Sequence, residues 1–296
     1  MSEINREEWL KARKTCIGGS DVAAILGESP YKNALDVYLS KVSEEPSEED
    51  KDHLAFGRDV EGAIANLYAK RTFRTVTDDG ATIIKRHPQY PFLGATLDRM
   101  TSHEDRDTIG PLELKHVGGF QRLDEWADEP PLHYQLQLQF QMFCTGSSWG
   151  CLAGMFPGYQ LAWSDFKYDA ELMESVLPHL IDFWRRVERR DPPEPTGKTA
   201  LDSVKKLFQI DHGTTIELGT DTENHATDLI SVKDTIKTLE ARKEELEAKI
   251  RFAIGDAEAA RFPGGGVATL KTTTRKGYVR EVKASTYRTL RLKGIS

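Results

Sequence analysis

The chain has 296 residues and a formal net charge of −7, and 39% of its residues are hydrophobic while 29% are charged. This composition supports one sizeable core with room for an appendage, and no apolar run is long enough to cross a membrane. The three cysteines are scattered and odd in number, which excludes a disulfide framework and a Cys-x-x-Cys metal site. Together with a polar start unlike a signal peptide, these features predict a cytoplasmic protein.

The negative charge taken alone argues against nucleic-acid binding, because affinity for phosphates comes from basic surface. The charge is unevenly distributed, however: residues 44–52 carry much of the acid, and residues 271–293 are strongly basic. An enzyme whose site is a carboxylate cluster also carries acid that a metal neutralises. The net charge therefore does not exclude an enzyme that acts on nucleic acid.

Hydrophobic periodicity and capping residues divide the first two thirds of the chain into helices and strands. Helices are predicted over residues 6–14, 22–26, 34–42, 53–72, 132–145 and 170–190, with a helical turn over 122–127. Ser20 or Asp21 is the expected N-cap of the helix over 22–26. Strands are predicted as a pair within 75–85 turning at Asp79-Gly80, and over 92–98, 109–115, 149–155 and 161–166. This order predicts an α/β fold with a mixed central sheet.

A proline-rich segment over 191–195 ends this region, so we predict one domain over residues 1–195 and an appendage over 196–296. Within the appendage, apolar residues recur at alternating spacings of three and four from Leu229 to Ala253, with Lys243 in the one polar slot. Such a heptad pattern predicts a coiled-coil helix over about 226–255, packed on a helix of the same chain or of a partner. Short basic strands are predicted within 266–293, over 267–274, 278–283 and 287–292.

Two acidic residues fall where adjacent strands meet. Asp98 ends one apolar run, and Glu113 and Lys115 lie two apart in the next, so both point to the same face of a strand. The polar interval over 103–108 can fold the two runs into a hairpin, which would bring Asp98 beside Glu113. Two adjacent carboxylates are costly without a cation, and oxygen ligands suit Mg²⁺ or Mn²⁺.

The helix over 132–145 carries glutamines at alternate positions: Gln135, Gln137, Gln139 and Gln141. On a helix, Gln137 and Gln141 share one face, and Gln135 and Gln139 share another. A glutamine run is commonly a solvated face, but beside a phosphate-handling site neutral amides can orient a water or hold a ligand. Glu61, within the helix over 53–72, would by itself be interpreted as a solvated side chain.

These motifs, taken in order, resemble the YqaJ-like viral recombinases, which are close to phage lambda exonuclease within the PD-(D/E)XK nuclease superfamily. The resemblance covers roughly residues 8–190. It rests on segments 17–27, 56–61, 87–92, 97–98, 112–115 and 134–139, and 285–291 resembles the tail of longer members. It implies a restriction-endonuclease-like core with a mixed central sheet flanked by helices, plus the coiled-coil helix and a small β extension.

The resemblance also implies roles for individual residues. It implies that Asp98, Glu113 and the Leu114 carbonyl bind Mg²⁺, for which Mn²⁺ substitutes, and that Glu61 joins this site. It implies that Lys115 positions or activates the attacking water, and that Gln139, with Gln137 as its companion, stands near the metal. Residues matching the 5′-phosphate and DNA contacts are Arg13, Ser20, Thr96 and Gln137, with Arg122 one position beyond Gln121, where the family has an arginine.

The function implied is a Mg²⁺-dependent 5′→3′ exonuclease on linear double-stranded DNA, encoded by a phage or prophage. Its partners would be DNA ends, a phage single-strand annealing protein that takes the 3′ strand, and further copies of the chain in a trimeric ring. One alternative is a PD-(D/E)XK endonuclease or RecB-like nuclease of other polarity. Another is a non-catalytic DNA-binding or assembly module in which the carboxylates are structural.

Overall fold

The computed structural model describes residues 6–43, 52–78, 83–118, 123, 126, 129–197, 199–277 and 286–292. The chain divides into two compact units, Met1–Leu207 and Phe208–Ser296, so the boundary falls later than the expected position near residue 195. Within the described ranges, no helix is long and apolar enough to cross a membrane.

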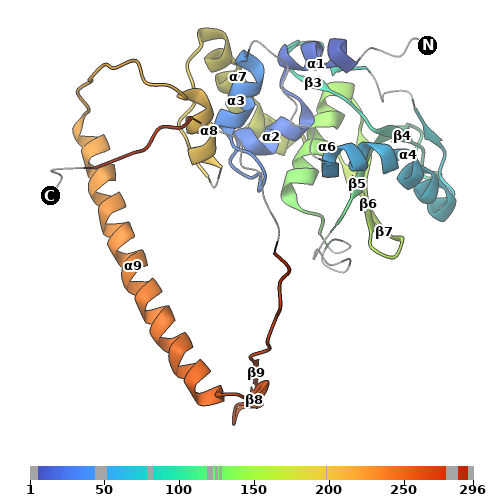
Figure 1. The fold of residues 1–296 in the computed structure, drawn as a ribbon. Helices are drawn as coiled ribbons and strands as arrows, with labels where there is room; N and C mark the ends of the chain where they lie inside the picture. The colour runs from blue at the N-terminus through green and yellow to red at the C-terminus, as the bar shows by residue number, and fades with distance from the viewer. Residues whose placement is uncertain are drawn as a thin grey trace. The chain divides into compact units, whose positions relative to one another are not determined.

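A five-stranded sheet forms the centre of the first unit (Figure 1). Its strands, in spatial order, are β1 (Val76–Thr77), β4 (Arg99–Thr101), β5 (Gly110–His116), β6 (Trp149–Phe156) and β7 (Gln160–Lys167). All neighbouring strands are antiparallel except β5 and β6, which are parallel. A parallel pair needs a crossover connection, and α6 (Leu132–Thr145) lies in it. The predicted mixed central sheet is confirmed.

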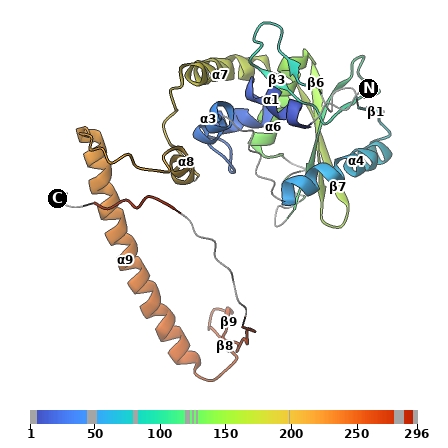
Figure 2. The same ribbon diagram turned by 45° about the horizontal axis from the view of Figure 1, so that its top comes forward.

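The alternation of side chains along β5 separates the core from the polar site. Leu112 and Leu114 pack with Ile64 and Tyr68 of α4 (Asp52–Thr72). On the other face of the sheet, α6 packs apolar side chains such as Leu138 against β6. Figure 2 shows α4 and α6 on either side of the sheet. The predicted helices over 53–72 and 132–145 are both present.

Further helices are described in the first unit, and all of them except the N-terminal one contribute side chains to a third apolar cluster beside the sheet. They are α1 (Arg6–Lys14), α2 (Gly19–Ile25), α3 (Ala34–Val42), α7 (Ala170–Arg189) and α8 (Ala200–Leu207). The predicted cap of α2 is wrong: Gly18 is the N-cap, and Asp21, three residues on, accepts a hydrogen bond from the Gly18 N–H at 3.0 Å. Ser20 therefore lies inside the first turn.

Helix α8 was not predicted, and polar contacts hold it to the first unit. The side-chain nitrogen of Asn33, the N-cap of α3, donates to Thr199 Oγ1 at 2.7 Å and to Ser203 Oγ at 3.1 Å. Both hydroxyls also donate to Asp36, and Ser203 is fully buried. Val204 and Leu207 also pack against the apolar cluster, but a helix this short has too few apolar positions for periodicity to predict its packing.

The predicted strand pair within 75–85 is wrong. Strand β1 pairs with β4, whereas β2 (Lys85–Arg86) pairs with β3 (Gly94–Ala95). Strands β1 and β2 are therefore not paired with each other. The predicted turn at Asp79-Gly80 lies outside the described residues. Strands of two residues carry no periodicity, so the sequence does not specify their partners. The pairing of β2 with β3 includes a close approach at Gly94, where an added Cβ would lie 2.6 Å from Ile84 Cγ2.

The second unit contains α9 (Thr220–Ile254) and the hairpin of β8 (Ala259–Arg261) and β9 (Val267–Thr269). The predicted heptad helix is confirmed with an earlier start, and none of its residues is buried. Of the predicted basic strands, 267–274 corresponds in part to β9, 278–283 lies outside the described residues, and 287–292 is not a strand.

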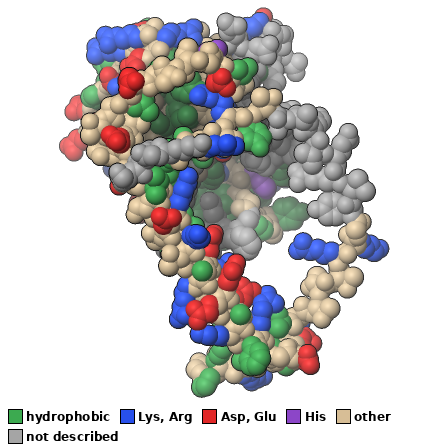
Figure 3. Space-filling model, turned by 60° about the vertical axis from the view of Figure 1, so that its left-hand side comes forward, with side chains coloured by type: hydrophobic (Ala, Val, Ile, Leu, Met, Phe, Trp, Pro, Cys, Tyr) green, Lys and Arg blue, Asp and Glu red, His purple; other side chains and the backbone are tan. Residues whose placement is uncertain are grey.

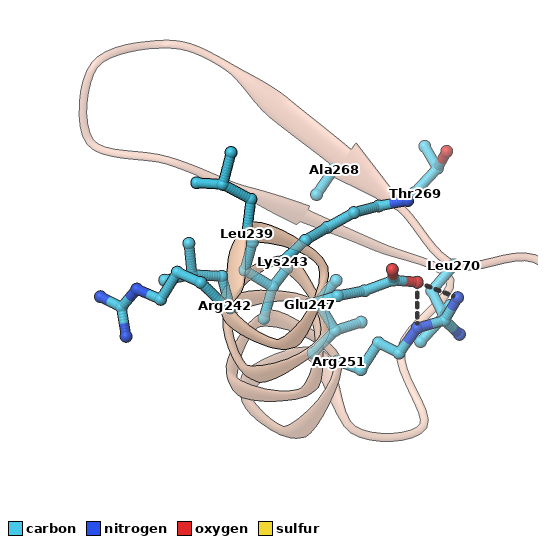
Figure 4. A pocket seen from close by; sticks show the side chains of 11 residues that line it. Leu239, Arg242, Lys243, Glu247, Arg251, Ala268, Thr269 and Leu270 are labelled. Atoms are coloured by element: carbon cyan, nitrogen blue, oxygen red, sulfur yellow. Dashed lines mark hydrogen bonds and ion pairs between the residues drawn. The ribbon is translucent and has the colours of Figure 1, made fainter. Parts of the chain in front are cut away.

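The apolar seam of α9 lines an open groove beside the hairpin. Figure 4 shows Leu239 and Lys243 on the side of α9 that faces the hairpin, with Ala268 opposite and the Glu247–Arg251 pair on the flank. Figure 3 shows hydrophobic side chains among charged ones of both signs in the lower part of the view, where α9 ends. The seam is thus accessible in a single chain: Leu239 is 63% exposed.

Candidate active site

The β4–β5 hairpin brings Asp98 beside β5, as the sequence predicted. Arg99 pairs with Leu112, and the backbone ladder between the two strands ends there. Asp98 precedes β4, and its Oδ2 accepts a hydrogen bond from the Leu114 backbone nitrogen at 2.8 Å. The Asp98 carboxylate therefore accepts the hydrogen bond that the next backbone carbonyl of a longer β4 would have accepted from β5. This bond fixes the carboxylate at the polar end of β5.

Glu113 is buried, and both of its oxygens have partners. Its Oε1 accepts hydrogen bonds from Gln137 Nε2 at 2.6 Å and from Lys115 Nζ. Its Oε2 accepts a hydrogen bond from Gln141 Nε2 at 2.6 Å. A buried carboxylate is tolerated only when it is paired and hydrogen-bonded, so these donors from β5 and α6 are what keep Glu113 in this position.

Lys115 lies between Glu113 and α6. Its Nζ also donates to Gln137 Oε1 at 3.2 Å and lies 4.9 Å from the ring centroid of Tyr134. Burial alone would lower the pKa of Lys115, but the Glu113 and Asp98 carboxylates outweigh burial and raise it. Lys115 is therefore an ammonium ion near neutral pH, suited to donating hydrogen bonds and positive charge rather than to accepting a proton.

Two acidic side chains of this cluster, Asp98 and Glu61, have raised pKa values in the absence of a metal. Burial raises the pKa of Asp98 well above its ordinary value, and the nearby Glu113 carboxylate raises it further. Burial also raises the pKa of Glu61, against the opposing effect of Arg99. A bound dication would reverse this preference, because it stabilises the ionised form.

The donor set fits a hard dication such as Mg²⁺ or Mn²⁺. Asp98 and Glu113 offer carboxylate oxygens, and Leu114 offers a backbone carbonyl on the same edge of β5 as its N–H, which faces Asp98. All-oxygen sets of this kind suit Mg²⁺. Glu61 does not complete the set: Arg99 Nη1 donates to Glu61 Oε1 at 2.6 Å. Among the residues that the structure describes, no three His, Cys, Asp or Glu side chains are arranged to hold a metal.

Gln139 was expected near the metal, and in the structure its side chain bonds backbone groups instead of the site carboxylates. Its Nε2 donates to the Lys167 carbonyl at 2.9 Å, and its Oε1 accepts from the Asp169 N–H at 2.9 Å. Gln139 thus joins α6 to the end of β7 and the start of α7. The phase of α6 on the sheet places Gln137 and Gln141, one turn apart, against Glu113 instead.

The residues expected to bind phosphate lie near this cluster. Arg13 Nη2 donates to Ser20 Oγ at 3.3 Å, at the start of α2. The start of α2 packs on α6, since an added Cβ at Gly19 would lie 3.1 Å from Gln137 Cγ. Thr96 contributes its carbonyl, which accepts from Gln141 Nε2 at 3.1 Å. Arg122 lies outside the described residues.

Three residues of this site were not predicted: Gln141 as a partner of Glu113, Arg99 and Tyr134. The spacing of four between Gln137 and Gln141 was the available signal for the first. The position of Arg99 directly after Asp98 gave no signal, because its partner Glu61 comes from a distant helix.

The mixed sheet, the flanking helices and an acidic pair on adjacent segments define a restriction-endonuclease-like fold. A structure of an alkaline exonuclease from Laribacter hongkongensis has this fold, with a TM-score of 0.52, 21% identity, and coverage of 62% of this chain and 94% of that chain. The model of the YqaJ-like viral recombinase domain matches residues 8–148. The uncharacterized protein YqaJ of Bacillus subtilis (strain 168) is 30% identical over 264 residues, covering 87% of this chain and 81% of that protein. The chain belongs to the YqaJ-like family.

Proposed function

We propose that the chain is a divalent-metal-dependent DNA exonuclease that degrades linear duplex DNA from its 5′ ends. The observation that carries this proposal is the convergence of Asp98, Glu113 and Lys115 at one end of β5. Two carboxylates and an ammonium group at one point suit hydrolysis of a phosphodiester, in which negative charge develops on the phosphate.

The protein's own groups have separate tasks in this reaction. Asp98, Glu113 and the Leu114 carbonyl would hold Mg²⁺, which supplies Lewis-acid stabilisation of the phosphate and lowers the pKa of water. Lys115 Nζ donates a hydrogen bond toward the attacked phosphate. Gln137 bonds both Lys115 and Glu113, so it fixes the ammonium and the carboxylate relative to each other.

Two findings support DNA as the substrate and the end of a strand as the point of attack. The solved structure that shares this fold is described as an alkaline exonuclease, and the matching family is described as viral recombinases. The Arg13–Ser20 pair offers a guanidinium and a hydroxyl close to α6, a combination that suits a terminal 5′-phosphate. We propose that the remaining 3′ strand passes to a single-strand annealing protein.

A digestion assay separates this proposal from its alternatives. Duplex DNA labelled at the 5′ or at the 3′ end, and the same DNA as a closed circle, is incubated with the chain in Mg²⁺ or EDTA. We expect Mg²⁺-dependent loss of linear DNA from the 5′ end and an intact circle. Cutting of the circle would indicate an endonuclease, loss from the 3′ end the opposite polarity, and no digestion a non-catalytic module.

A further inference from the structure

Arg99 is bound to the third carboxylate of the site. Its Nη1 donates to Glu61 Oε1 at 2.6 Å, and its Nε lies 2.5 Å from Asp78 Oδ1. The same Nη1 donates to the carbonyl of Asp98. The Arg99 side chain is 16% exposed, and that of Glu61 is 26% exposed. The guanidinium is therefore held between α4 and the start of β4, next to the Asp98–Glu113 pair.

This arrangement fixes a permanent positive charge in the cluster. A guanidinium stays protonated at every pH at which the protein is folded. Centres with two metals place the ions about 3.5–4 Å apart and need carboxylates beyond those that hold the first ion. Glu61 is the carboxylate available for this purpose, because its charge interacts with those of Asp98 and Glu113. Its Oε1, however, accepts a hydrogen bond from Arg99.

The charge of the cluster leads to the same conclusion. Asp98, Glu113, Glu61 and the exposed Asp78 bring four negative charges, while Lys115 and Arg99 return two positive charges, which leaves two negative charges when all six are ionised. One dication is compatible with this balance. A second dication would leave a large positive excess beside a fixed guanidinium, and like charges at short range in a partly buried site repel strongly.

We propose that Arg99 occupies the place that a second divalent cation would take, so that each chain holds a single metal ion on Asp98, Glu113 and the Leu114 carbonyl. This inference rests on the proposed metal-dependent function. In this arrangement, Arg99 supplies a fixed charge beside the metal, and Glu61 is the residue that positions that charge. Removing the guanidinium frees Glu61 to become a metal ligand.

The number of Mn²⁺ ions bound per chain tests the proposal without reference to activity. Mn²⁺ is titrated into the full chain, and bound ions are counted by electron paramagnetic resonance, with and without a phosphorothioate duplex that resists cleavage. We expect one ion in the wild type under both conditions and two spin-coupled ions in Arg99→Gln. Arg99→Lys, which keeps a cation, and Asp78→Asn, which alters only the exposed partner, should each bind one.

The number of ions bound by each variant distinguishes the role of Arg99 from the proposed metal-dependent function. Two ions in the wild type, or one ion in folded Arg99→Gln, would overturn the role of Arg99 while leaving the metal-dependent function intact. No ion in any variant would overturn the proposed metal site itself. Should Arg99→Gln fail to fold, as judged by circular dichroism, the wild-type count with bound duplex still decides: one ion supports the proposal and two contradict it.

Discussion

The side-chain nitrogen of Gln141 lies 2.6 Å from Oε2 of Glu113, so a residue of α6 fixes the orientation of a carboxylate on β5. The same nitrogen donates to the Thr96 carbonyl at 3.1 Å. Within the described residues, Gln141 Oε1 is buried and has no hydrogen-bond partner. The two hydrogen bonds donated by Nε2 therefore fix the Gln141 side chain, and they link the segment before Asp98 to Glu113.

Replacing Gln141 with methionine should impair the reaction more than the fold. The change keeps the volume but removes the donor from Glu113, and loss of such supporting contacts to a metal ligand costs about 10–100-fold in affinity or activity. We expect a fall in kcat within that range, measured under saturating DNA, and a modest loss of unfolding free energy, because the donor lost from the buried Glu113 Oε2 is only partly offset by removal of the unpartnered Oε1.

The matched control is Gln139→Met, two residues away on the same helix. Gln139 bonds the Lys167 carbonyl and the Asp169 N–H, away from the carboxylates. Loss of its contacts should cost about 1–3 kcal/mol of unfolding free energy, and the rate per folded molecule should stay unchanged. If instead Gln139→Met lowers kcat and Gln141→Met does not, the assignment of the two glutamines is reversed.

Asp98→Asn should stabilise the metal-free protein at high pH. Because the folded-state pKa of Asp98 is raised, its contribution to stability is complete below its ordinary pKa and is lost as pH rises through the folded value. Asparagine stays neutral and can still accept from the Leu114 N–H. In EDTA, the melting temperature of Asp98→Asn should exceed that of the wild type at pH 8, and the gap should shrink toward pH 4.

The same melting experiment in Mg²⁺ provides the control, since a ligand that binds only the folded state stabilises it. Mg²⁺ should raise the melting temperature of the wild type and have little effect on Asp98→Asn. A variant that is less stable than the wild type in EDTA at pH 8 would show that Asp98 is not strained as an anion.

A partly buried ion pair between Arg74 and Asp165, separate from the proposed metal ligands, should matter for stability alone. Arg74 Nη1 and Nη2 donate to the two oxygens of Asp165 at 2.7 and 2.8 Å, and Nη1 also donates to the Tyr68 hydroxyl at 2.8 Å. Burial would raise the pKa of Asp165, but the hydrogen bonds from Arg74 and Cys151, together with the charges of Arg74 and Arg106, outweigh burial and lower it. Arg74→Met should cost about 1–3 kcal/mol in urea unfolding, because Asp165 loses both hydrogen bonds from the guanidinium and keeps the more distant basic side chains of Arg106 and His103, at 4.0 and 3.9 Å.

This cost depends on pH in a defined direction. Since the pKa of Asp165 is lowered in the folded state, the stability it contributes is present above its ordinary pKa and is lost as pH falls through the folded value. The difference between Arg74→Met and the wild type should therefore narrow in acid. Arg186→Met, which breaks a solvent-accessible pair with Asp182, should change stability by less than about 1 kcal/mol at any pH.

The exposed seam of α9 gives a prediction about association. A helix of 35 residues with none buried gains little from packing in a single chain, so we expect the seam to pack on another helix. Leu239→Asp should lower the molar mass measured by light scattering. Ala241→Asp, on the other side of the helix, should not. Equal masses for both variants and the wild type would exclude the seam as an association surface.

Local patterns predicted the elements on which the site depends. The bounds of α1, α3 and α6 match the sequence prediction because each carries clear periodicity or a capping residue. The proximity of Asp98 to Glu113 followed from the strand period and a polar turn, both of which are local properties. The Gln137–Gln141 face followed from helix geometry.

The features of the fold and the site that the sequence did not predict depend on how distant segments pack. The choice of Gln141 over Gln139 is decided by the phase of α6 on the sheet, where Leu138 and Met142 are fully buried. The pairing of β1 with β4 joins segments whose own sequences are too short to specify a partner. The contact of Arg99 with Glu61 joins β4 to α4, two elements that are distant in the sequence, so no local pattern predicts it.

The central claim is that Asp98 and Glu113 share a divalent metal, and anomalous diffraction from Mn²⁺-soaked crystals tests it most directly. We predict an anomalous peak about 2.0–2.2 Å from a carboxylate oxygen of each residue and near the Leu114 carbonyl. A peak at another group of residues, or none between Asp98 and Glu113 at a Mn²⁺ concentration that supports digestion, would contradict the claim.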